Sequence, residues 1–147
     1  MVALVRPKLV IQVVPLTEVS DTAYSALHEM VLQPWEEGNS SLAYKLDEPE
    51  EDDIALLARH QRRLVGWACL NPMEGYDSAR LNIYVLPRYR RKGIGRVLFE
   101  KATRVAKRRG YSSLYAQAAN GASGDFWKAL GFEEDLLEMP AGYDYYF

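Results

Sequence analysis

The segment that most constrains the fold of this chain is a strand, a loop and a helix that follow one another between residues 79 and 109. Apolar and polar side chains alternate from Ala79 to Leu86, which predicts a half-buried strand. After Gly93, apolar residues recur at helical spacing as far as Ala106, which predicts an amphipathic helix. Ser113 to Ala118 then predicts another strand. Two strands joined through a helix are expected to be parallel, with a right-handed crossover.

The flanking segments predict antiparallel partners for this unit. Ile54–Arg59 and Leu64–Leu70 are separated only by a polar turn at Gln61 and Arg62, which indicates a hairpin. The predicted order is completed by a strand at 9–15, one or two helices from Ser20 or Asp21, a short helix at 123–130 and a strand pair at 132–139 and 143–147. We therefore predict an α/β (α+β) fold, with a mixed, mostly antiparallel central sheet of six to seven strands and helices on both faces.

Length and composition limit the classes of protein to consider. The 147 residues suffice for one compact domain, so we expect residues 1–147 to form a single domain. No apolar run reaches the about 18 residues of a membrane span, and the first residues do not resemble a secretory signal. Cys69 is the only cysteine, which excludes an internal disulfide and a cysteine-based zinc site. We expect a cytoplasmic protein with no membrane partner and no metal.

Charge is distributed unevenly, although the net charge is only −2. Ten of the 18 Lys and Arg residues lie between Arg88 and Arg109, where only Glu100 opposes them. Eight acidic residues lie between Glu36 and Asp53, where only Lys45 opposes them. Two solvated surfaces would explain this pattern, but it also suits one site for an anion and another for a cation. We expect no nucleic-acid partner, because the basic residues alternate with the apolar stripe of the predicted helix and the chain is mildly acidic.

The basic residues begin in a loop that has the features of an anion site. This loop runs directly from the predicted strand into the first turn of the predicted helix. Such a turn leaves backbone N–H groups without acceptors and carries positive partial charge. Gly93 and Gly95 would let a ligand approach these groups closely. With Arg90, Arg91 and Lys92 beside them, the loop suits a pyrophosphate.

Two common phosphate-binding motifs are excluded by their spacing. A P-loop has four residues between its glycines, followed by Lys-Ser or Lys-Thr, and the dinucleotide-binding fingerprint has three glycines and a downstream acid. Neither pattern is present around Gly93 and Gly95.

A more specific pattern is present instead. Arg90-x-x-Gly93-x-Gly95 follows Val85-x-Pro87 at the end of the predicted strand, and Asn120 and Phe126 precede Leu130-Gly131-Phe132 farther along. In these motifs and in the order of its elements, the chain resembles the GNAT family of N-acetyltransferases. The resemblance extends from about Leu9 to Phe147 and is weakest between Trp35 and Asp53. It implies the acyl-CoA N-acyltransferase fold and an enzyme that takes its acetyl group from acetyl-CoA.

The resemblance also implies roles for residues near the loop. The pantetheine arm of coenzyme A would lie along the backbone of Ile83, Tyr84 and Val85 like an added strand, where the strands before and after the main helix splay apart. A backbone N–H near Val85 would polarise the thioester carbonyl. Asn120 would contact the pantetheine. The pyrophosphate would bind the backbone N–H groups from Arg91 to Arg96, a stretch that includes Lys92, Gly93, Ile94 and Gly95.

One position departs from the pattern of the family. Many members place a tyrosine in the last helix as the general acid for the leaving thiolate. When Asn120 and Gly131-Phe132 are matched to the family's motif, that position here is Trp127. An indole N–H does not titrate near neutral pH. Three interpretations remain open. The thiolate leaves without a side-chain acid, a tyrosine (Tyr84, Tyr143, Tyr145 or Tyr146) supplies the proton, or the protein binds acyl-CoA without catalysing transfer.

The general base for the attacking amine is also open. Glu74 and Asp77 flank the start of the strand that carries Tyr84, although both are more simply interpreted as turn residues. A water chain could carry the proton instead.

The expected acceptor is a primary amine that attacks the thioester directly. In the family, the acceptor site forms between the first helices and the last hairpin, which here implies Trp35, Glu36, Glu37 and Tyr143. Carboxylates and an aromatic ring suit a cationic amine. A small molecule and a peptide or protein amine both fit this description. A homodimer is compatible with the habits of the family.

Overall fold

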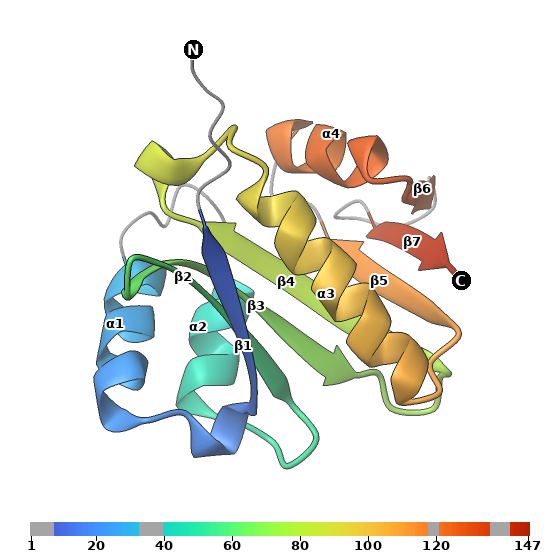
Figure 1. Ribbon diagram of the computed structural model, residues 1–147. Coiled ribbons are helices and arrows are strands. Elements are labelled where there is room, and N and C mark those ends of the chain that lie inside the picture. The colour runs from blue at the N-terminus through green and yellow to red at the C-terminus, as the bar shows by residue number, and fades with distance from the viewer. Residues whose placement is uncertain (1–7, 33–39, 118–120, 136–141) are drawn as a thin grey trace.

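The chain folds around a seven-stranded sheet, in a computed structural model that describes residues 8–32, 40–117, 121–135 and 142–147 (Figure 1). The strands lie in the order β1-β2-β3-β4-β5-β7-β6, and among these described strands only β4 and β5 pair in parallel. The elements are β1 (Leu9–Pro15), η1 (Leu16–Glu18), α1 (Asp21–Leu32), α2 (Ser40–Asp47), β2 (Ile54–His60), β3 (Arg63–Pro72), β4 (Ser78–Val85), η3 (Pro87–Tyr89), α3 (Ile94–Arg108), β5 (Ser113–Gln117), α4 (Gly121–Ala129), β6 (Glu133–Asp135) and β7 (Gly142–Tyr146). The predicted mixed sheet and the predicted order of elements are both confirmed.

Helices cover both faces of the sheet, as predicted. Leu56 on β2 packs in the same apolar cluster as Leu98 of α3, whereas its neighbour Leu57 packs with Leu27 of α1. Figure 1 shows α3 lying across one face of the sheet, with α1 and α2 on the other. Strands buried on both faces need apolar side chains at successive positions, which explains the nearly continuous apolar sequence of β2 and β3.

The ends of α1 and α3 follow from local sequence. The N–H of Ala23 donates to Oγ of Ser20 at 3.2 Å, so Ser20 caps the start of α1. At the end of α3, Gly110 has a φ of 88° and the N–H of Tyr111 donates to the carbonyl of Ala106 at 3.1 Å. This is the left-handed glycine cap expected at a helix C-terminus.

The hairpin of β2 and β3 turns at the predicted polar pair. His60 and Arg63 are paired, which leaves Gln61 and Arg62 as a two-residue loop with φ values of 51° and 68°. Positive φ at both positions is the turn geometry that matches the twist of the flanking strands. The hairpin therefore forms without the glycine that usually accompanies such a turn.

Candidate active site

β4 and β5 separate next to the loop that leads into α3. Their paired residues are Ser78–Ser113, Ala79–Leu114 and Arg80–Tyr115. Beyond these pairs β4 continues along β3 as far as Val85, and β5 continues along β7 as far as Gln117. From Leu81 to Val85, one edge of β4 faces away from β3. None of the described strands pairs with that edge. The two strands thus splay where the resemblance to the GNAT family implies.

The backbone groups on this open edge can be assigned from one hydrogen bond. The N–H of Leu86 donates to the carbonyl of Val65 on β3 at 2.9 Å. Along a strand, the N–H and C=O groups of alternate residues point to the same side. Those of Ile83 and Val85 therefore point away from β3, towards the side that β5 has left. An extended ligand could pair with them as a further strand would.

The loop before α3 presents backbone N–H groups to the same region. Arg91 and Gly93 have φ values of 61° and 83°, so the chain curls sharply before the helix begins. No side chain caps the first turn, which also contains no acidic residue. The N–H of Val97 donates to the Gly93 carbonyl at 3.1 Å, which leaves the N–H groups of residues 94–96 without intrahelical acceptors. Free N–H groups at the start of a helix can hold an anion.

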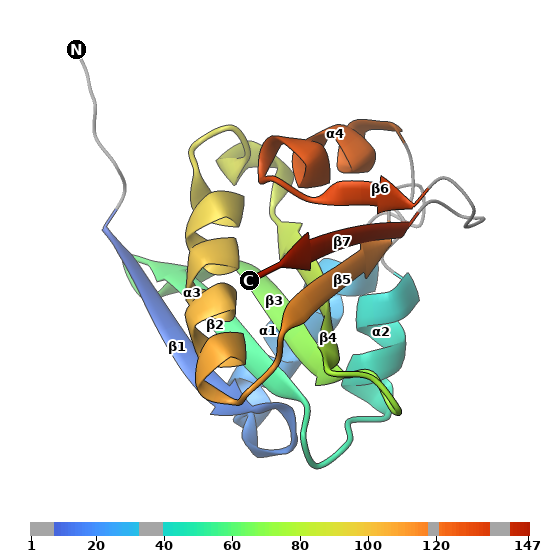
Figure 2. The ribbon, with the colours of Figure 1, turned by 90° about the vertical axis from the view of Figure 1, so that its right-hand side faces the viewer.

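The two glycines of the loop are required for different reasons. Gly93 has open space within 4 Å of where a Cβ would lie, and its positive φ is what favours glycine. A Cβ on Gly95 would come within 3.0 Å of the Phe126 ring of α4. Gly95 therefore lets α4 pack closely against the start of α3, a contact that Figures 1 and 2 place at the loop end of α3. The sequence predicts that Gly95 allows close approach of a ligand, and the structure adds this packing role, which no sequence pattern reveals.

Arg90 turns back onto the end of β4. Its Nε–H donates to the carbonyl of Val85 at 2.8 Å, and its guanidinium lies 5.4 Å from the centre of the Tyr84 ring. Of the other cations, Arg91 and Lys92 are exposed, and Lys92 Nζ lies 5.6 Å from the Tyr89 ring. The side chain of Arg96 reaches the Ala129 carbonyl of α4 at 3.4 Å.

Comparison with known proteins agrees with this geometry. The sequence profile of the Acetyltransferase (GNAT) family matches residues 24–132, well over half of the chain.

The chain belongs to the GNAT acetyltransferase family.

Solved structures of GNAT proteins share the fold. An acetyltransferase of the family from Staphylococcus aureus Mu50 is 19% identical, with a TM-score of 0.74 over 93% of this chain and 99% of that one. The PaiA N-acetyltransferase from Thermoplasma acidophilum, solved with coenzyme A, is also 19% identical, with a TM-score of 0.73 over 94% and 99%. The ribosomal-protein-S18-alanine N-acetyltransferase from Escherichia coli is 20% identical, with a TM-score of 0.65 over 92% and 91%. No curated protein matches the sequence significantly.

Membership of the GNAT family identifies acetyl-CoA as the acyl donor. The loop and the edge of β4 fit the two ends of this donor, because one offers N–H groups to an anion and the other offers an extended amide chain a strand edge with which no described strand pairs. In the described part of the chain, no group of three or more His, Cys, Asp or Glu residues is placed to hold a metal ion. None of the described helices is long and apolar enough to span a membrane.

Of the aromatic candidates for the GNAT site, Tyr84, Trp127 and Tyr143 are buried, whereas Tyr146 is 65% exposed. The Tyr84 side chain is 3% exposed in the cluster under α1 and α2, next to Trp67 on β3. Trp127 is 5% exposed, and its ring lies 5.0 Å from the rings of both Phe126 and Phe132. Tyr143 packs in the other cluster, on the α3 face of the sheet. Trp127, which the resemblance to the family places at the position of its tyrosine acid, is therefore a core residue.

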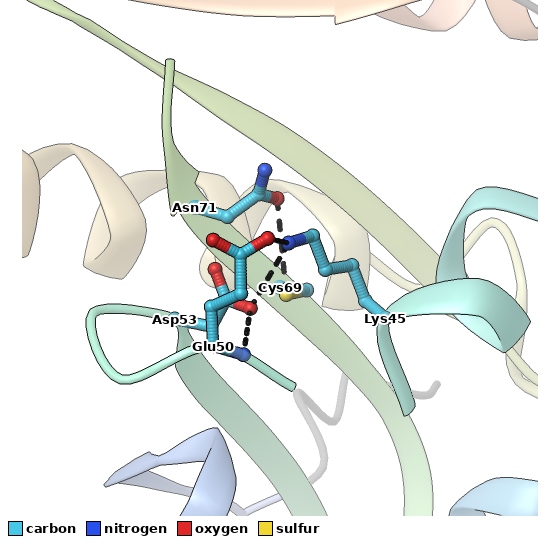
Figure 3. Close-up of polar contacts among 5 residues, drawn as sticks. All are labelled: Lys45, Glu50, Asp53, Cys69 and Asn71. Atoms are coloured by element: carbon cyan, nitrogen blue, oxygen red, sulfur yellow. Dashed lines mark hydrogen bonds and ion pairs between the residues drawn. The ribbon is translucent and has the colours of Figure 1, made fainter. Parts of the chain in front are cut away.

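Part of the acidic segment supports α2 instead of facing solvent (Figure 3). The carboxylate of Asp53, which is 1% exposed, accepts a hydrogen bond from the Glu50 N–H at 2.8 Å and lies 3.2 Å from Nζ of Lys45. Lys45 also pairs with the Glu50 carboxylate at 2.9 Å. Burial lowers the pKa of Lys45, but the hydrogen bonds and charges of Glu50 and Asp53 outweigh that effect and raise it. These contacts tie α2 to the start of β2.

Cys69 lies beside this group and is not a nucleophile. The side chain is fully buried, with Sγ 3.9 Å from Oδ1 of Asn71. Burial, together with the charge of Asp53, raises the pKa of the Cys69 thiol to about 12. The thiol is therefore protonated at neutral pH, and its interpretation as a buried small residue is confirmed.

Four of the predicted site residues lie outside the described part of the chain. These are Trp35, Glu36, Glu37 and Asn120. Their assignment to the acceptor site and to the pantetheine stays a prediction.

Proposed function

We propose that this chain transfers the acetyl group of acetyl-CoA to a primary amine by direct attack of the amine on the thioester. The observation that carries the proposal is the adjacency of two features along the chain. The edge of β4 with which no described strand pairs ends at Val85, and the proposed anion site begins six residues later, at the turn of Arg91 and Gly93. Coenzyme A has an extended amide arm joined to a pyrophosphate, and so requires both features in this order.

The backbone does most of the proposed binding. The N–H groups from Arg91 to Arg96 hold the pyrophosphate at the positive end of α3. The backbone groups of Ile83 and Val85 pair with the pantetheine amides. Near the thioester, the N–H of Val85 polarises the carbonyl that the amine attacks. Asn120 contacts the pantetheine.

Direct attack is supported by the chemistry of the side chains. A covalent acyl-enzyme needs an activated nucleophile. The lone thiol, Cys69, is buried and its pKa is raised, so it does not serve. With Trp127 packed in the core, the thiolate leaves unassisted or takes its proton from Tyr84, which adjoins Val85 on β4.

We propose a cationic acceptor that binds near Trp35, Glu36, Glu37 and Tyr143. The exposed acids Asp47, Glu48, Glu51 and Asp52 add negative charge on the same stretch of chain. A peptide or protein amine fits as well as a small molecule. The name of the Escherichia coli relative, a ribosomal-protein-S18-alanine N-acetyltransferase, supports a protein acceptor for this fold.

The burial of Trp127 favours a second candidate, a module that binds acyl-CoA without transfer. Release of free thiol from acetyl-CoA over a panel of diamines, amino acids and peptides separates the two functions. Thiol release that depends on the amine supports the transferase. Tight coenzyme A binding with no thiol release for any amine supports the module.

Donor binding itself is tested by charge reversal at the loop. Arg91→Glu with Lys92→Glu should weaken coenzyme A binding at least tenfold in calorimetry, which corresponds to about 1.4 kcal/mol. Arg104→Glu with Arg108→Glu is the matched control, since it makes the same change of charge on exposed positions about 15 and about 21 Å from the start of α3. If both double variants lost coenzyme A affinity equally, the loop would not be the pyrophosphate site.

A further inference from the structure

The face of the sheet opposite α3 carries a polar pair where β4 and β5 part. Leu81 on β4 and Leu114 on β5 belong to the apolar cluster under α3. Because side chains alternate along a strand, their neighbours Arg80 and Tyr115 lie on the opposite face. Arg80 and Tyr115 are also the last paired residues before the two strands separate. This pair therefore marks the start of the separation on the face that α1 and α2 share.

Arg80 is half-buried and has no counter-ion. Its guanidinium carbon lies 5.4 Å from the centre of the Tyr115 ring, within the range of a cation–π contact. In the described part of the chain, no carboxylate pairs with Arg80 and no hydrogen bond joins its side chain to another residue. A guanidinium has five N–H donors, and an aromatic ring supplies no oxygen for any of them. Arg80 is therefore able to bind an anion.

The positions around Arg80 on this face carry no acidic side chain. Its partner on β3 is Asn71, and the next positions of β4 on the same face are Ser78 and Asn82. The buried Nδ2 group of Asn82 also has no hydrogen-bond acceptor among the described residues. A buried donor without an acceptor destabilises a protein. Two neighbouring donor groups on one face thus lack acceptors, which points to a ligand that carries oxygen atoms.

We propose that Arg80 binds a carboxylate of the acceptor, so that the acceptor carries a carboxylate as well as the primary amine. This assignment rests on the proposed transfer of an acetyl group to an amine. A guanidinium presents parallel N–H donors that match both oxygens of a carboxylate. In the transfer, the amine nitrogen bonds to the acetyl carbon, the C–S bond of the thioester breaks, and the proton lost by the amine leaves with the thiol. The carboxylate is unchanged and positions the amine.

The length of β4 sets the spacing between the two groups of the acceptor. Arg80 lies five residues before Val85, which is about 17 Å along a strand. With the thioester near Val85 and a contact of about 3 Å at each end, the amine and the carboxylate lie about 10 Å apart. A single α-carbon separates the two groups in a free α-amino acid, which is too short. A peptide of about three residues spans this distance. We therefore expect the N-terminal amine of a peptide whose carboxylate lies about two residues farther on.

Thiol release with matched peptides tests the proposal. Trialanine and trialanine amide differ only at the carboxylate, and the wild type should use trialanine with a kcat/KM at least tenfold higher, which corresponds to about 1.4 kcal/mol. In Arg80→Gln the ratio of the two kcat/KM values should fall to about one, and Arg80→Lys should restore part of it. Arg63→Gln is the matched control, since Arg63 is exposed at the start of β3, and its ratio should equal that of the wild type. Ala-Ala-Glu amide distinguishes a side-chain carboxylate from a C-terminal one, and a preference for either that depends on Arg80 supports the proposal.

Product binding gives a second measurement that needs no turnover. In calorimetry with the coenzyme A complex, the wild type should bind N-acetyltrialanine at least tenfold more tightly than its amide, and Arg80→Gln should bind both equally. Thiol release with no preference for a carboxylate, or a preference that survives in Arg80→Gln, would overturn this inference and leave the transferase standing. Absence of thiol release together with product binding that depends on Arg80 would overturn the transferase and support the carboxylate site. Absence of both would overturn both.

Discussion

Arg90 in the loop holds the carbonyl oxygen of Val85 at the end of β4, with an Nε–O distance of 2.8 Å. That carbonyl lies on the edge of β4 that faces away from β3, so Arg90 occupies a group that a strand-like ligand would use. Arg90→Met removes this competing contact and one positive charge. We expect pantetheine, which has no phosphate, to bind about two- to fivefold more tightly, since one exposed hydrogen bond contributes about 0.5–1 kcal/mol. Coenzyme A should bind more weakly, because the charge near its phosphates is lost.

Competition binding with both ligands measures the two effects. Arg91→Met is the control, since Arg91 is exposed and has no such contact with Val85. The Arg91→Met variant should bind coenzyme A more weakly and bind pantetheine with unchanged affinity. If Arg90→Met weakened the binding of pantetheine as much as that of coenzyme A, the contact of Arg90 with Val85 would not compete with the ligand.

Gly95 and Phe126 are expected to be coupled in stability. Gly95→Ala places a Cβ about 3.0 Å from the Phe126 ring and should cost about 1–2 kcal/mol by overpacking. In a Phe126→Leu background the smaller side chain leaves room for the added Cβ. Gly95→Ala should then be neutral or stabilising, because alanine favours helix. Urea unfolding of the four proteins in this double-mutant cycle gives the coupling.

Gly93→Ala is the contrasting change in the same loop. Nothing lies within 4 Å of its Cβ position, so the cost comes from the φ of +83° and should be about 1 kcal/mol. Phe126→Leu should not relieve it. Equal coupling of both glycines to Phe126 would contradict the separate roles assigned to them.

Lys45 should contribute more to stability than an exposed ion pair. Lys45→Met leaves the Asp53 carboxylate, 1% exposed, with only the Glu50 N–H as a partner, and should cost about 2–4 kcal/mol. Lys128→Met is matched in side-chain type, but Lys128 pairs with Glu134 at 3.4 Å on the surface and should cost under about 1 kcal/mol. Similar unfolding free energies for the two variants would show that the Lys45–Asp53 pair stabilises the fold no more than the exposed Lys128–Glu134 pair does.

Cys69 should make the protein less stable in alkali. Burial raises its pKa to about 12 from 9.0, so the unfolded chain releases the thiol proton at lower pH than the folded chain does. The contribution of the protonated thiol to the free energy of unfolding is complete below pH 9 and is lost as the pH rises towards 12. Between pH 8 and pH 10 the wild type should therefore lose about 1 kcal/mol more than Cys69→Ala, measured by urea unfolding. Parallel losses in the two proteins would mean that the thiol titrates normally.

The elements around the loop were predictable because their signals are local. The alternation from Ala79 to Leu86 and the helical stripe after Gly93 predict β4 and α3, and the caps at Ser20 and Gly110 need only neighbouring residues. The position of β7 was not predictable in the same way. The sequence indicates that the last two strands pair, which they do, but β7 also pairs with β5 and separates β6 from it. Such long-range pairing leaves no periodicity to detect.

Side-chain contacts between distant segments were also beyond the sequence. The charge pattern indicates only that the acidic residues between Glu36 and Asp53 suit a cation or a solvated surface, whereas Asp53 and Glu50 hold Lys45. Nothing in the spacing of Arg90 shows that its side chain turns back to Val85. The uncapped helix start proposed as the anion site was predictable because it depends on backbone geometry, which glycines and strand ends reveal.

The most direct test of donor binding is a map of backbone amide shifts on titration with coenzyme A. We predict the largest changes at the amides of residues 94–96, at the start of α3, and at those of Ile83 and Val85 on the open edge of β4. The amides of Tyr84 and Leu86, which point towards β3, should change less. Saturating shifts confined to other parts of the molecule, or no shifts at millimolar coenzyme A, would contradict the assignment of the loop and of β4 to the acyl donor.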